Sequence, residues 1–432
     1  MSRIAIIGGG LAGLTAAIRL AQNGQTVSLF EAAPELGGRT RSFYDRTLNM
    51  WVDNGPHLMV GAYRATRKLA KDAGFAANIH WQKKLHLPLW DPSRGFFDFT
   101  PPAWLPLPLG MLLAASRLPG HDLSSAAAML RIGLARTPPD HLSVAEWLQQ
   151  LRCPEPLVRD MLEPLCLGSM NEGLDSANAM SFAKVLKEAF ARHDAARLGW
   201  FTKPLSQGLI EPLASYAESL GVEIHTSCRV RSLQESAAGI DLEINADKNR
   251  DGNQNDESNL QRFDSAIIAL PAHARNRLLG IDEEVETRPI TNIHLWFNEA
   301  IHLPTPLLGG IGTSGQWVFD VARQLDEERS HLCAVISDDQ ERREVAANRI
   351  NAITAEIGTI LGIAHPSISH HRIITERHAT VIVRPKINES VSQLEKVTDA
   401  AEQPQPGEFP STIESAVLRG EQAAELHLVH CI

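Results

Sequence analysis

The sequence that decides the fold lies near the start of the chain, where Ser2 to Glu31 reads SRIAIIGGGLAGLTAAIRLAQNGQTVSLFE. The isoleucine-rich run Ser2–Ile7 is typical of a buried parallel strand. After the glycines, the apolar spacing predicts a helix over Leu14–Asn23, and Gln25–Phe30 predicts a second strand. A strand, a glycine turn, a helix, a second strand and an acid, in that order, predict a dinucleotide-binding βαβ unit.

Each glycine of the turn has a physical role in such a unit. Gly8 permits a tight turn, Gly10 lets the backbone approach a pyrophosphate, and Gly13 lets the helix pack closely on the sheet. Next to them, the N–H groups of Leu11 and Ala12 at the helix start are available to phosphate oxygens. A chance glycine turn is the alternative, but the flanking strand and helix favour cofactor binding.

An acidic residue ends the second predicted strand. Glu31 lies 18 residues after Gly13 and is followed by Ala32. A carboxylate in this place binds the hydroxyl pair of an adenosine ribose, and its charge repels a 2′-phosphate. The unit therefore predicts an adenine dinucleotide other than NADP.

Composition and charge exclude several classes of protein. Of 432 residues, 44% are hydrophobic and 21% charged, which is typical of a globular protein and, at this length, predicts two domains. A net charge of −10 without a basic block argues against nucleic-acid binding. The five cysteines form no CxxC pair, which favours reduced thiols and a cytoplasmic location. We expect neither a secretory signal nor a membrane-spanning segment.

The residues after Glu31 narrow the cofactor. Positions 32–41 read AAPELGGRTR. This loop resembles that of the FAD-dependent amine oxidases and phytoene-type desaturases. The resemblance implies that Gly37, Gly38, Arg39 and Thr40 contact the diphosphate of FAD. A simple turn is the alternative interpretation of the two glycines.

The resemblance also implies a fold and a domain organisation. It implies an α/β protein in which a Rossmann-type FAD-binding domain is interleaved with a mixed α+β substrate domain. The strand AIIALP, which ends at Leu270-Pro271, marks one return of the chain to the FAD-binding domain. The expected limits are 1–80, 206–274 and 391–432 for the FAD-binding domain, and 81–205 and 275–390 for the substrate domain.

Further FAD contacts follow from the same resemblance. PSTIESAV (410–417) resembles the closing helix of the family, whose N-terminus points at the flavin ring. Thr398-Asp399 stands where the family usually has Gly-Asp. No cysteine lies in 398–420, so the FAD is expected to be non-covalent. The implied contacts outside the first 40 residues are Gly55, Pro56, His57, Arg229, Val230, Leu270, Pro271, Asp399, Thr412 and Ile413.

Within this superfamily the chain resembles the hydroxysqualene dehydroxylases, also described as squalene-associated FAD-dependent desaturases. The resemblance rests on VDNGPHLMVGAY (52–63), SVAEWL (143–148), EPLCLGSMNE (163–172), SFAKVL (181–186) and PSTIESAV. It implies an enzyme of squalene and hopanoid biosynthesis that replaces the allylic hydroxyl of hydroxysqualene by hydrogen. Such a reaction needs hydride from reduced FAD, a proton for the departing hydroxyl, and an apolar tunnel for a C30 chain.

Two residues are candidates for the proton donor. Glu163 lies in the apolar block MLEPL (161–165), where burial would raise its pKa and keep the carboxyl protonated. A helix-end surface acid is the alternative interpretation. His57 lies close to Gly55 on a segment expected near the flavin, and a structural histidine bonded to the backbone is its alternative.

The most apolar stretch, Ala103–Ser116, reads AWLPLPLGMLLAAS and is too short to span a bilayer. It is either a core segment or a surface that dips into a membrane. Because the implied substrate resides in membranes, we expect peripheral binding to the inner face of the membrane. The sequence does not predict an oligomeric state.

Several other sequence patterns do not indicate a cofactor or metal site. Gly310 to Gly315 also fits GxGxxG, but a strand-like segment follows it, so a hairpin turn is predicted. His370 and His371 are adjacent and point apart in any regular element. The remaining cluster, at the end of the sequence, is interpreted as unliganded tail residues, and no metal site is predicted. Its members are His427, His430 and Cys431.

Two rival functions remain open. A carotenoid-type desaturase or an amine oxidase would use the flavin in the oxidative direction. A non-catalytic FAD-binding partner of a squalene-synthesis complex would retain FAD without turning over hydroxysqualene.

Overall fold

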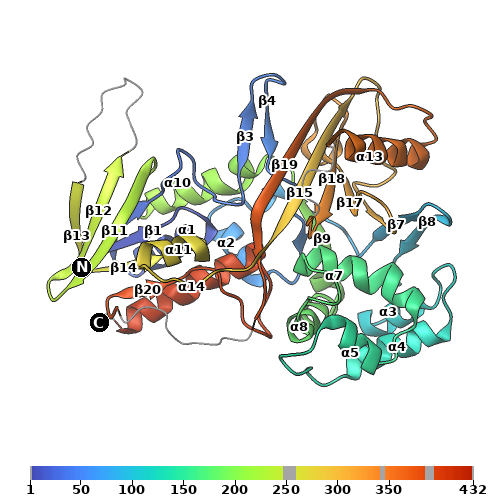
Figure 1. Ribbon diagram of the computed structural model, residues 1–432, viewed down its shortest axis with the longest axis horizontal. Coiled ribbons are helices and arrows are strands. Elements are labelled where there is room, and N and C mark those ends of the chain that lie inside the picture. Colours follow the sequence, from blue (N-terminus) through green and yellow to red (C-terminus); the bar gives the residue numbers. More distant parts are fainter. Residues whose placement is uncertain (1, 247–258, 341–345, 385–393, 431–432) are drawn as a thin grey trace.

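The computed structural model describes residues 2–246, 259–340, 346–384 and 394–430. It has two lobes (Figure 1). One lobe contains the ends of the chain, and the other is largely helical, with a large sheet above the helices. The long strands β15 (Thr287–Phe297) and β19 (Ile368–Val381) pair with each other where the lobes meet. This α/β architecture confirms the predicted fold class.

Within the described residues, five strands form a parallel sheet in the order β10-β2-β1-β14-β20. Its central strands are buried on both faces, which explains their nearly continuous apolar runs. The strands come from widely separated parts of the chain. Their bounds are β1 (Arg3–Ile7), β2 (Thr26–Phe30), β10 (Glu223–His225), β14 (Ser265–Ile268) and β20 (Val397–Asp399).

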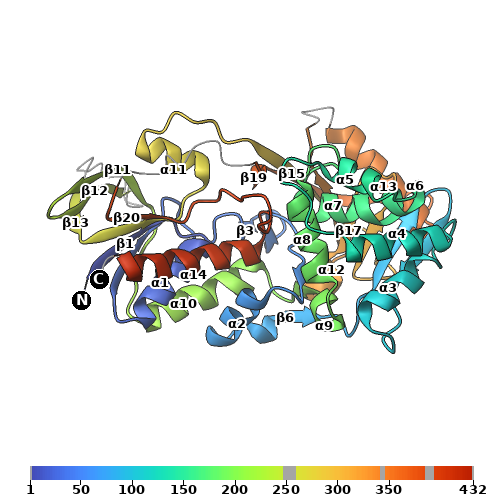
Figure 2. The same ribbon diagram turned by 90° about the horizontal axis from the view of Figure 1, so that it is seen from below.

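Helices cover one face of this sheet, and a small antiparallel sheet covers the other. Figure 2 shows α1, α10 and α14 side by side on the helical face. Their bounds are α1 (Leu11–Gln22), α10 (Glu211–Ser219) and α14 (Ile413–His430). The opposite face packs against β11 (Cys228–Ser236), β12 (Gly239–Ala246) and β13 (Asn259–Phe263). The helix α11 (Ala272–Leu279) follows β14.

One predicted strand was wrong. The residue pattern of Val222–Leu233 predicts one continuous strand, but the chain there is divided into β10, in the parallel sheet, and β11, in the antiparallel sheet. Ser227, with φ +54°, turns the chain between them. The division has a physical reason, since the N–H of Cys228 bonds the carbonyl oxygen of Glu31 at 2.8 Å while the chain crosses the end of β2. The polar stretch 245–262, which the sequence predicts to be a hairpin tip, runs from the end of β12 into β13, and its middle lies outside the described residues.

A mixed sheet forms the second layer, and seven described strands contribute to it in the order β19-β15-β18-β17-β16-β7-β8. The helix α13 (Ala346–Leu361) covers one face through Ile350, Ile353 and Ile357. The helical lobe packs on the other face, against residues such as Phe319. The remaining bounds are β7 (Leu87–Asp91), β8 (Gly95–Phe99), β16 (Leu307–Gly310), β17 (Trp317–Asp320) and β18 (His331–Ser337).

The helical lobe begins with the most apolar segment of the sequence. The spacing of Ser143 and Glu146 predicts a capping box, and this box opens α5. Ser143 and Glu146 each bond the other's backbone N–H, at 3.2 and 2.9 Å. The segments of this lobe are α3 (Leu107–Ala115), α4 (Leu123–Leu134), α5 (Val144–Gln150), α6 (Glu155–Leu157), a π-helical turn (Val158–Leu162), α7 (Glu163–Met170), α8 (Ala179–Ala189) and α9 (His193–Ala196).

Short elements complete the chain. β3 and β4 form a hairpin, and β5, β9 and β6 form a small sheet. Their bounds are β3 (Ser42–Asp45), β4 (Met50–Asp53), β5 (Met59–Val60), β6 (Ile79–Trp81) and β9 (Leu198–Phe201). The other helical segments are α2 (Arg64–Asp72), a 3₁₀ turn (Ala76–Asn78), a π-helical turn (Ser206–Ile210) and α12 (Val321–Leu325).

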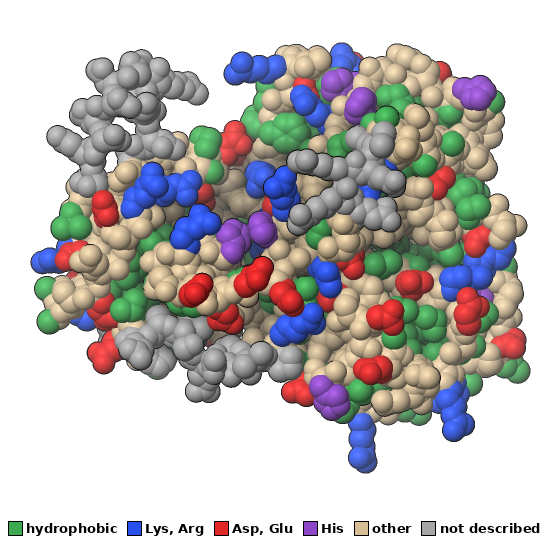
Figure 3. Space-filling view, viewed as in Figure 1, with side chains coloured by type: hydrophobic (Ala, Val, Ile, Leu, Met, Phe, Trp, Pro, Cys, Tyr) green, Lys and Arg blue, Asp and Glu red, His purple; other side chains and the backbone are tan. Residues whose placement is uncertain are grey.

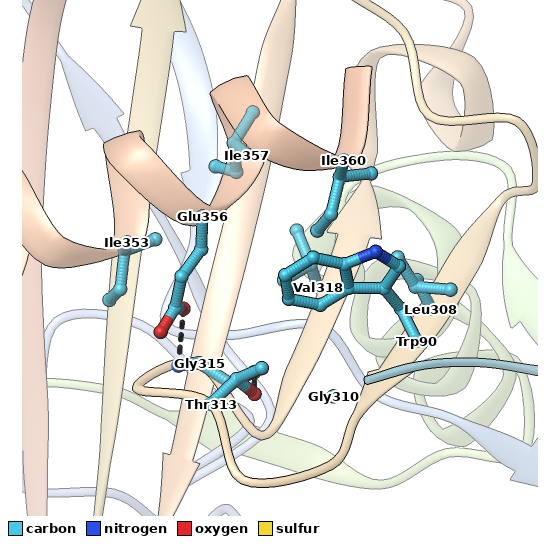
Figure 4. Close-up of a pocket in the computed structure, with 10 residues that line it drawn as sticks. All are labelled: Trp90, Leu308, Gly310, Thr313, Gly315, Val318, Ile353, Glu356, Ile357 and Ile360. Carbon is cyan, nitrogen blue, oxygen red and sulfur yellow. Dashed lines mark hydrogen bonds between the residues drawn. The ribbon is translucent and has the colours of Figure 1, made fainter. Parts of the chain in front are cut away.

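The second glycine motif is the predicted hairpin turn, because β16 and β17 pair antiparallel on either side of it. The Glu356 carboxylate of α13 accepts from the N–H of Ser314 at 2.8 Å and from that of Gly315 at 3.4 Å. Figure 4 shows the bond to Gly315. Beside this contact lies an apolar pocket of about 10 Å³ lined by residues such as Trp90 and Ile357. That volume holds about one water molecule, so the pocket is a packing defect.

Candidate functional site

The glycine turn between β1 and α1 is built as the sequence predicts. A Cβ atom at Gly13 would lie 1.9 Å from the carbonyl oxygen of Gly8, so helix and turn could not approach each other with any larger residue. Gly8 itself has φ +113°. At Gly10 the position is different, because no heavy atom of the described residues lies within 4 Å of a Cβ built there. The space above Gly10 is therefore available to a ligand.

The start of α1 faces that space. No side chain caps the helix at Gly10, and its first turn contains no acidic residue. The first helical N–H groups, including those of Leu11 and Ala12, have no partner within the helix. Together with the positive end of the helix dipole they form an anion-binding site.

Glu31 lies at the end of β2, beside the glycine turn. Its Oε2 accepts from the N–H of Gly9 and its Oε1 from the N–H of Ala33, each at 2.7 Å. These two bonds fix the carboxylate next to Ala32 and leave further lone pairs for a ribose. Arg229 and Val230 lie on β11 directly after Cys228, which bonds the backbone of Glu31.

The GGR loop packs directly over the glycine turn. The N–H of Gly37 bonds the carbonyl oxygen of Gly9 at 2.9 Å, and a Cβ at Gly38 would lie 3.6 Å from the Cα of Gly10. The φ angles of +107° at Gly37 and +58° at Gly38 favour glycine. Thr40 closes the turn, because its hydroxyl donates to the carbonyl oxygen of Gly37 at 2.8 Å.

Arg39 makes contacts that the sequence did not indicate. Its guanidinium forms an ion pair with buried Glu402 and donates to the carbonyl oxygen of Ala379 at 2.7 Å. Glu402 also pairs with Arg419 of α14, at 3.3 Å. Burial opposes ionisation of Glu402, but the two arginines together lower its pKa. The Arg39–Glu402–Arg419 network therefore places positive charge beside the glycine turn.

The segment after β4 joins this cluster through Asn54, whose side chain donates to the carbonyl oxygen of Arg39 at 2.7 Å. Gly55 packs against Asn292 of β15, and a Cβ at Gly55 would lie 2.5 Å from that side chain. After Pro56, the Nδ1 of His57 bonds the carbonyl oxygen of Gly55 at 2.9 Å. Burial lowers the pKa of His57, so its ring is neutral near pH 7 and is a poor proton donor.

The N-terminus of α14 completes the arrangement. Thr412 and Ser415 cap it reciprocally, with bonds of 2.8 and 3.1 Å, so that Ile413 begins the helix. The hydroxyl of Ser411 accepts from the N–H of Val381 at 3.0 Å and so ties this terminus to β19. The N-termini of α1 and α14 therefore both lie next to the residues expected to hold a cofactor.

Asp399 has a partner that the sequence did not reveal. It forms an ion pair with Arg275 of α11, whose side chain is buried, and accepts from the N–H of Ala401 at 2.8 Å. The Leu270 side chain lies 3.2 Å from the Cβ position of Gly8, and Pro271 directly precedes α11. Arg275 holds Asp399 in place, although Thr398 stands before Asp399 where the family usually has glycine.

Two carboxyl groups lie on α7 or at its end, in the helical lobe. Glu163 starts α7 and is half-buried, and burial together with Asp175 raises its pKa. Glu172, just after α7, is buried, and its pKa is raised to about 7, chiefly by that burial. Sequence reasoning missed Glu172, although it lies in the quoted block 163–172.

The tail interpretation of His427 was wrong. The side chain is buried in α14, where Nε2 lies 2.7 Å from the hydroxyl of Ser265 and Nδ1 lies 3.0 Å from that of Thr398. Burial lowers its pKa to about 4. It therefore joins α14 to the parallel sheet. A search of the described residues finds no group of three His, Cys, Asp or Glu that could hold a metal ion.

These residues fit a flavin dinucleotide. The open space at Gly10, the free helix start, the fixed Glu31 and the arginine beside Gly38 match a pyrophosphate with an adenosine ribose. Comparison with known proteins agrees with this geometry. Residues 11–426 match the family model of the flavin containing amine oxidoreductases. The chain belongs to this family, and it is an FAD-dependent oxidoreductase.

Particular relatives are similar along the whole chain. A hydroxysqualene dehydroxylase from Zymomonas mobilis is 26% identical and covers 100% of both chains. One from Sinorhizobium fredii is 28% identical over 98% of this chain and 97% of its own. Among solved structures, a putative protoporphyrinogen oxidase from Exiguobacterium sp. superposes with a TM-score of 0.70 at 14% identity, covering 99% of each chain, which supports the fold alone.

Proposed function

We propose that this chain catalyses the reductive dehydroxylation of hydroxysqualene to squalene, in hopanoid and squalene biosynthesis. The observation that carries the proposal is the similarity to hydroxysqualene dehydroxylases from end to end of the chain. The flavin-type geometry of the glycine turn, Glu31 and the GGR loop supports it.

FAD is held without a covalent bond in this proposal. Backbone N–H groups of the glycine turn and the start of α1 bind the diphosphate, Glu31 binds the ribose, and Arg39 supplies positive charge. The start of α14 stabilises negative charge at the flavin ring. The segment 398–420 contains no cysteine that could form a thioether link. Acid precipitation of the purified protein should release all flavin, and yellow colour left in the pellet would contradict non-covalent binding.

Bound reduced FAD supplies hydride to the carbon that loses its hydroxyl. The chain supplies the rest: it places the allylic carbon, excludes water from the developing cation, and protonates the departing oxygen. The α14 N-terminus and β19, joined through Ser411 and Val381, form one wall of the region expected around the ring.

Anaerobic reaction of the reduced protein with hydroxysqualene tests this function. Squalene should form in proportion to the flavin that returns to its oxidised absorbance. Extra double bonds with concurrent flavin reduction would instead support the desaturase or amine-oxidase alternative. Retained FAD with no product in either direction would support a non-catalytic partner.

Membrane binding is the second part of the proposal. The side chains of Leu123, Leu130 and Leu134 are exposed along one face of α4, and α3 packs beside it with Leu109 exposed. Trp104, just before α3, is 78% exposed. Figure 3 shows hydrophobic side chains among charged ones over this lobe. No helix within the described residues is long and apolar enough to cross a membrane.

We infer that this apolar surface docks on a bilayer at the cytoplasmic side, where a membrane-resident substrate is available. Exposed Arg117 and Arg136, after α3 and α4, suit anionic headgroups. Replacing Leu123 and Leu134 by Asp should reduce flotation with anionic vesicles and leave turnover in detergent unchanged. Leu260→Asp, at a leucine on β13 that is 66% exposed, is the control. Equal flotation of both variants would contradict docking through α4.

A further inference from the structure

The end of α7 lies at the junction of the two lobes. Asn171 adopts the left-handed conformation there, with φ +56°, and its side chain donates to the hydroxyl of Thr380 at 2.9 Å. Its Oδ1 accepts from the N–H of Asp338 at 2.7 Å. The residue after Asn171 is therefore fixed against β19.

Thr380 lies between two residues that contact the candidate flavin site. The carbonyl oxygen of Ala379 accepts from Arg39, and the N–H of Val381 donates to Ser411, directly before the capped start of α14. The GGR loop and the α14 N-terminus thus bracket the point on β19 to which α7 is anchored. Glu172 is the acidic residue at this anchor.

The Glu172 side chain is buried and incompletely bonded. It is 1% exposed, and its Oε2 has no hydrogen-bond partner among the residues that the structure describes. A buried carboxylate oxygen without a donor is costly, and protonation removes that cost. The groups that face Glu172 are Arg288 from β15, Arg384 after β19, Asp338 after β18, Ser176 after α7, and Cys166 within α7.

A solvent groove lies next to two of the residues that act on the Glu172 carboxyl group. It has a volume of about 980 Å³ and is lined by Ser176 and Arg384, which both act on Glu172, and by polar residues of the α5 and α8 starts such as Asn178. The groove is polar, so it suits water and protons and not a C30 hydrocarbon. Ser176 lines the groove and also acts on the Glu172 carboxyl group. Its hydroxyl, which donates to the carbonyl oxygen of Gly173 at 3.3 Å, can relay a proton.

We propose that Glu172 is the catalytic acid of the dehydroxylation, and that Ser176 and the polar groove return protons to it from solvent. This proposal rests on the proposed function. The C–O bond breaks with its electron pair on oxygen, that oxygen takes the proton of Glu172, and water leaves. The new C–H bond takes its electron pair from the hydride of reduced FAD, which an external electron donor must reduce again. Glu172 regains its proton from the groove.

Glu163 and His57, the two proton donors that the sequence suggested, are less well placed than Glu172. Glu163 is nine positions away at the other end of α7, half-buried and close to exposed Asp175, so it has readier access to solvent. The Nδ1 of His57 bonds the Gly55 carbonyl. Glu172 is the more deeply buried of the two α7 carboxyl groups, and of these two it is the one that has a buried oxygen without a partner among the described residues.

Glu172→Gln tests the assignment, with Glu163→Gln as the matched control. After anaerobic reduction, hydroxysqualene should reoxidise the flavin of Glu172→Gln about 10²–10⁴-fold more slowly than that of the wild type. Glu163→Gln should reoxidise at the wild-type rate. The wild-type rate should fall as pH rises through about 7, and the residual rate of Glu172→Gln should not. FAD stoichiometry and thermal unfolding of both variants establish that they are folded.

Infrared spectroscopy gives a readout that needs no turnover. The band of a protonated carboxyl group should titrate near pH 7 in the wild type and be absent from Glu172→Gln. Normal reoxidation in Glu172→Gln, or an infrared band that Glu163→Gln removes instead, overturns the assignment. If the wild type forms no squalene, the proposed function fails and the catalytic role fails with it. The infrared titration then separately decides whether Glu172 is a protonated buried acid.

Discussion

Gly420 of α14 lies directly against the backbone of α1: a Cβ atom there would meet the carbonyl oxygen of Ala12 at 2.4 Å. We expect Gly420→Ala to push α14 away from α1 and to cost about 1–3 kcal/mol of the free energy of unfolding, as overpacking does. Urea denaturation measures this. Gly133→Ala in α4, where no described heavy atom lies within 4 Å, is the control and should be neutral or slightly stabilising.

Substitutions at Gly10 and Gly13 should affect different properties of the protein, although both glycines belong to one motif. Gly10→Val should fold normally and retain no FAD, because its side chain would enter the open space that suits the pyrophosphate. Gly13→Ala should unfold at lower temperature even without FAD, because its methyl group would overlap the carbonyl oxygen of Gly8. Thermal unfolding of the cofactor-free proteins and the flavin content of the purified ones separate the two effects. Stoichiometric FAD in Gly10→Val would show that the motif binds in another register.

Glu31→Ala should weaken FAD binding by about 1.5–3 kcal/mol, the range for a hydrogen bond to a charged group. Titration of the cofactor-free protein with FAD measures the change. The carboxylate also fixes the N–H groups of Gly9 and Ala33, so part of the loss reflects a less ordered turn. Glu35→Ala, at an exposed acid of the same loop, should bind FAD like the wild type.

Glu414 caps α2 from α14. Its carboxylate accepts from the N–H groups of Ala65 and Thr66 and from the Thr66 hydroxyl, at 2.7–2.9 Å, in a buried setting. Glu414→Ala should cost about 1–3 kcal/mol, because buried donors lose their acceptor. Glu425→Ala, at an exposed position of the same helix, should cost much less in the same urea experiment.

His427 should make stability depend on pH. Its pKa is about 4 in the folded chain and 6.5 when unperturbed, so the unfolded state binds the proton more readily. The free energy of unfolding is therefore highest above about pH 6.5 and falls as pH drops toward 4. His427→Gln should flatten this part of the profile. If the free energy of unfolding of His427→Gln falls between pH 7 and pH 5 as steeply as that of the wild type, His427 does not contribute to this pH dependence.

The sequence predicted those features that a short stretch of backbone determines. Gly8, Gly13 and Glu31 lie within one βαβ unit, whose geometry follows from local spacing, and the Ser143–Glu146 capping box and the β16–β17 hairpin are also local. The single strand over Val222–Leu233 was wrong because local propensity does not say where a chain changes sheets.

Residues that depend on distant partners could not be predicted in this way. Glu402 meets Arg39 across more than 360 positions, and Arg275 meets Asp399 across 124. The burial of His427 depends on Ser265 in the parallel sheet. Glu172 is the last residue of a family-like block, which is a weak indication of function. Its burial and its unpartnered oxygen could not be predicted, because they depend on how the end of α7 packs against β15 and β19.

The contact of α14 with α1 has a consequence for biosynthesis. The first strand and helix of the cofactor unit leave the ribosome early, but the helix that covers them comes from residues 413–430. Of the described helices, α14 packs most extensively on α1, so this part of α1 stays uncovered until residues 413–430 are present. A nascent chain therefore exposes this face of α1 until residues 413–430 have left the ribosome, and stable cofactor binding follows that step. This chain order predicts that removal of residues 413–430 exposes α1 and raises the dependence of folding on chaperones.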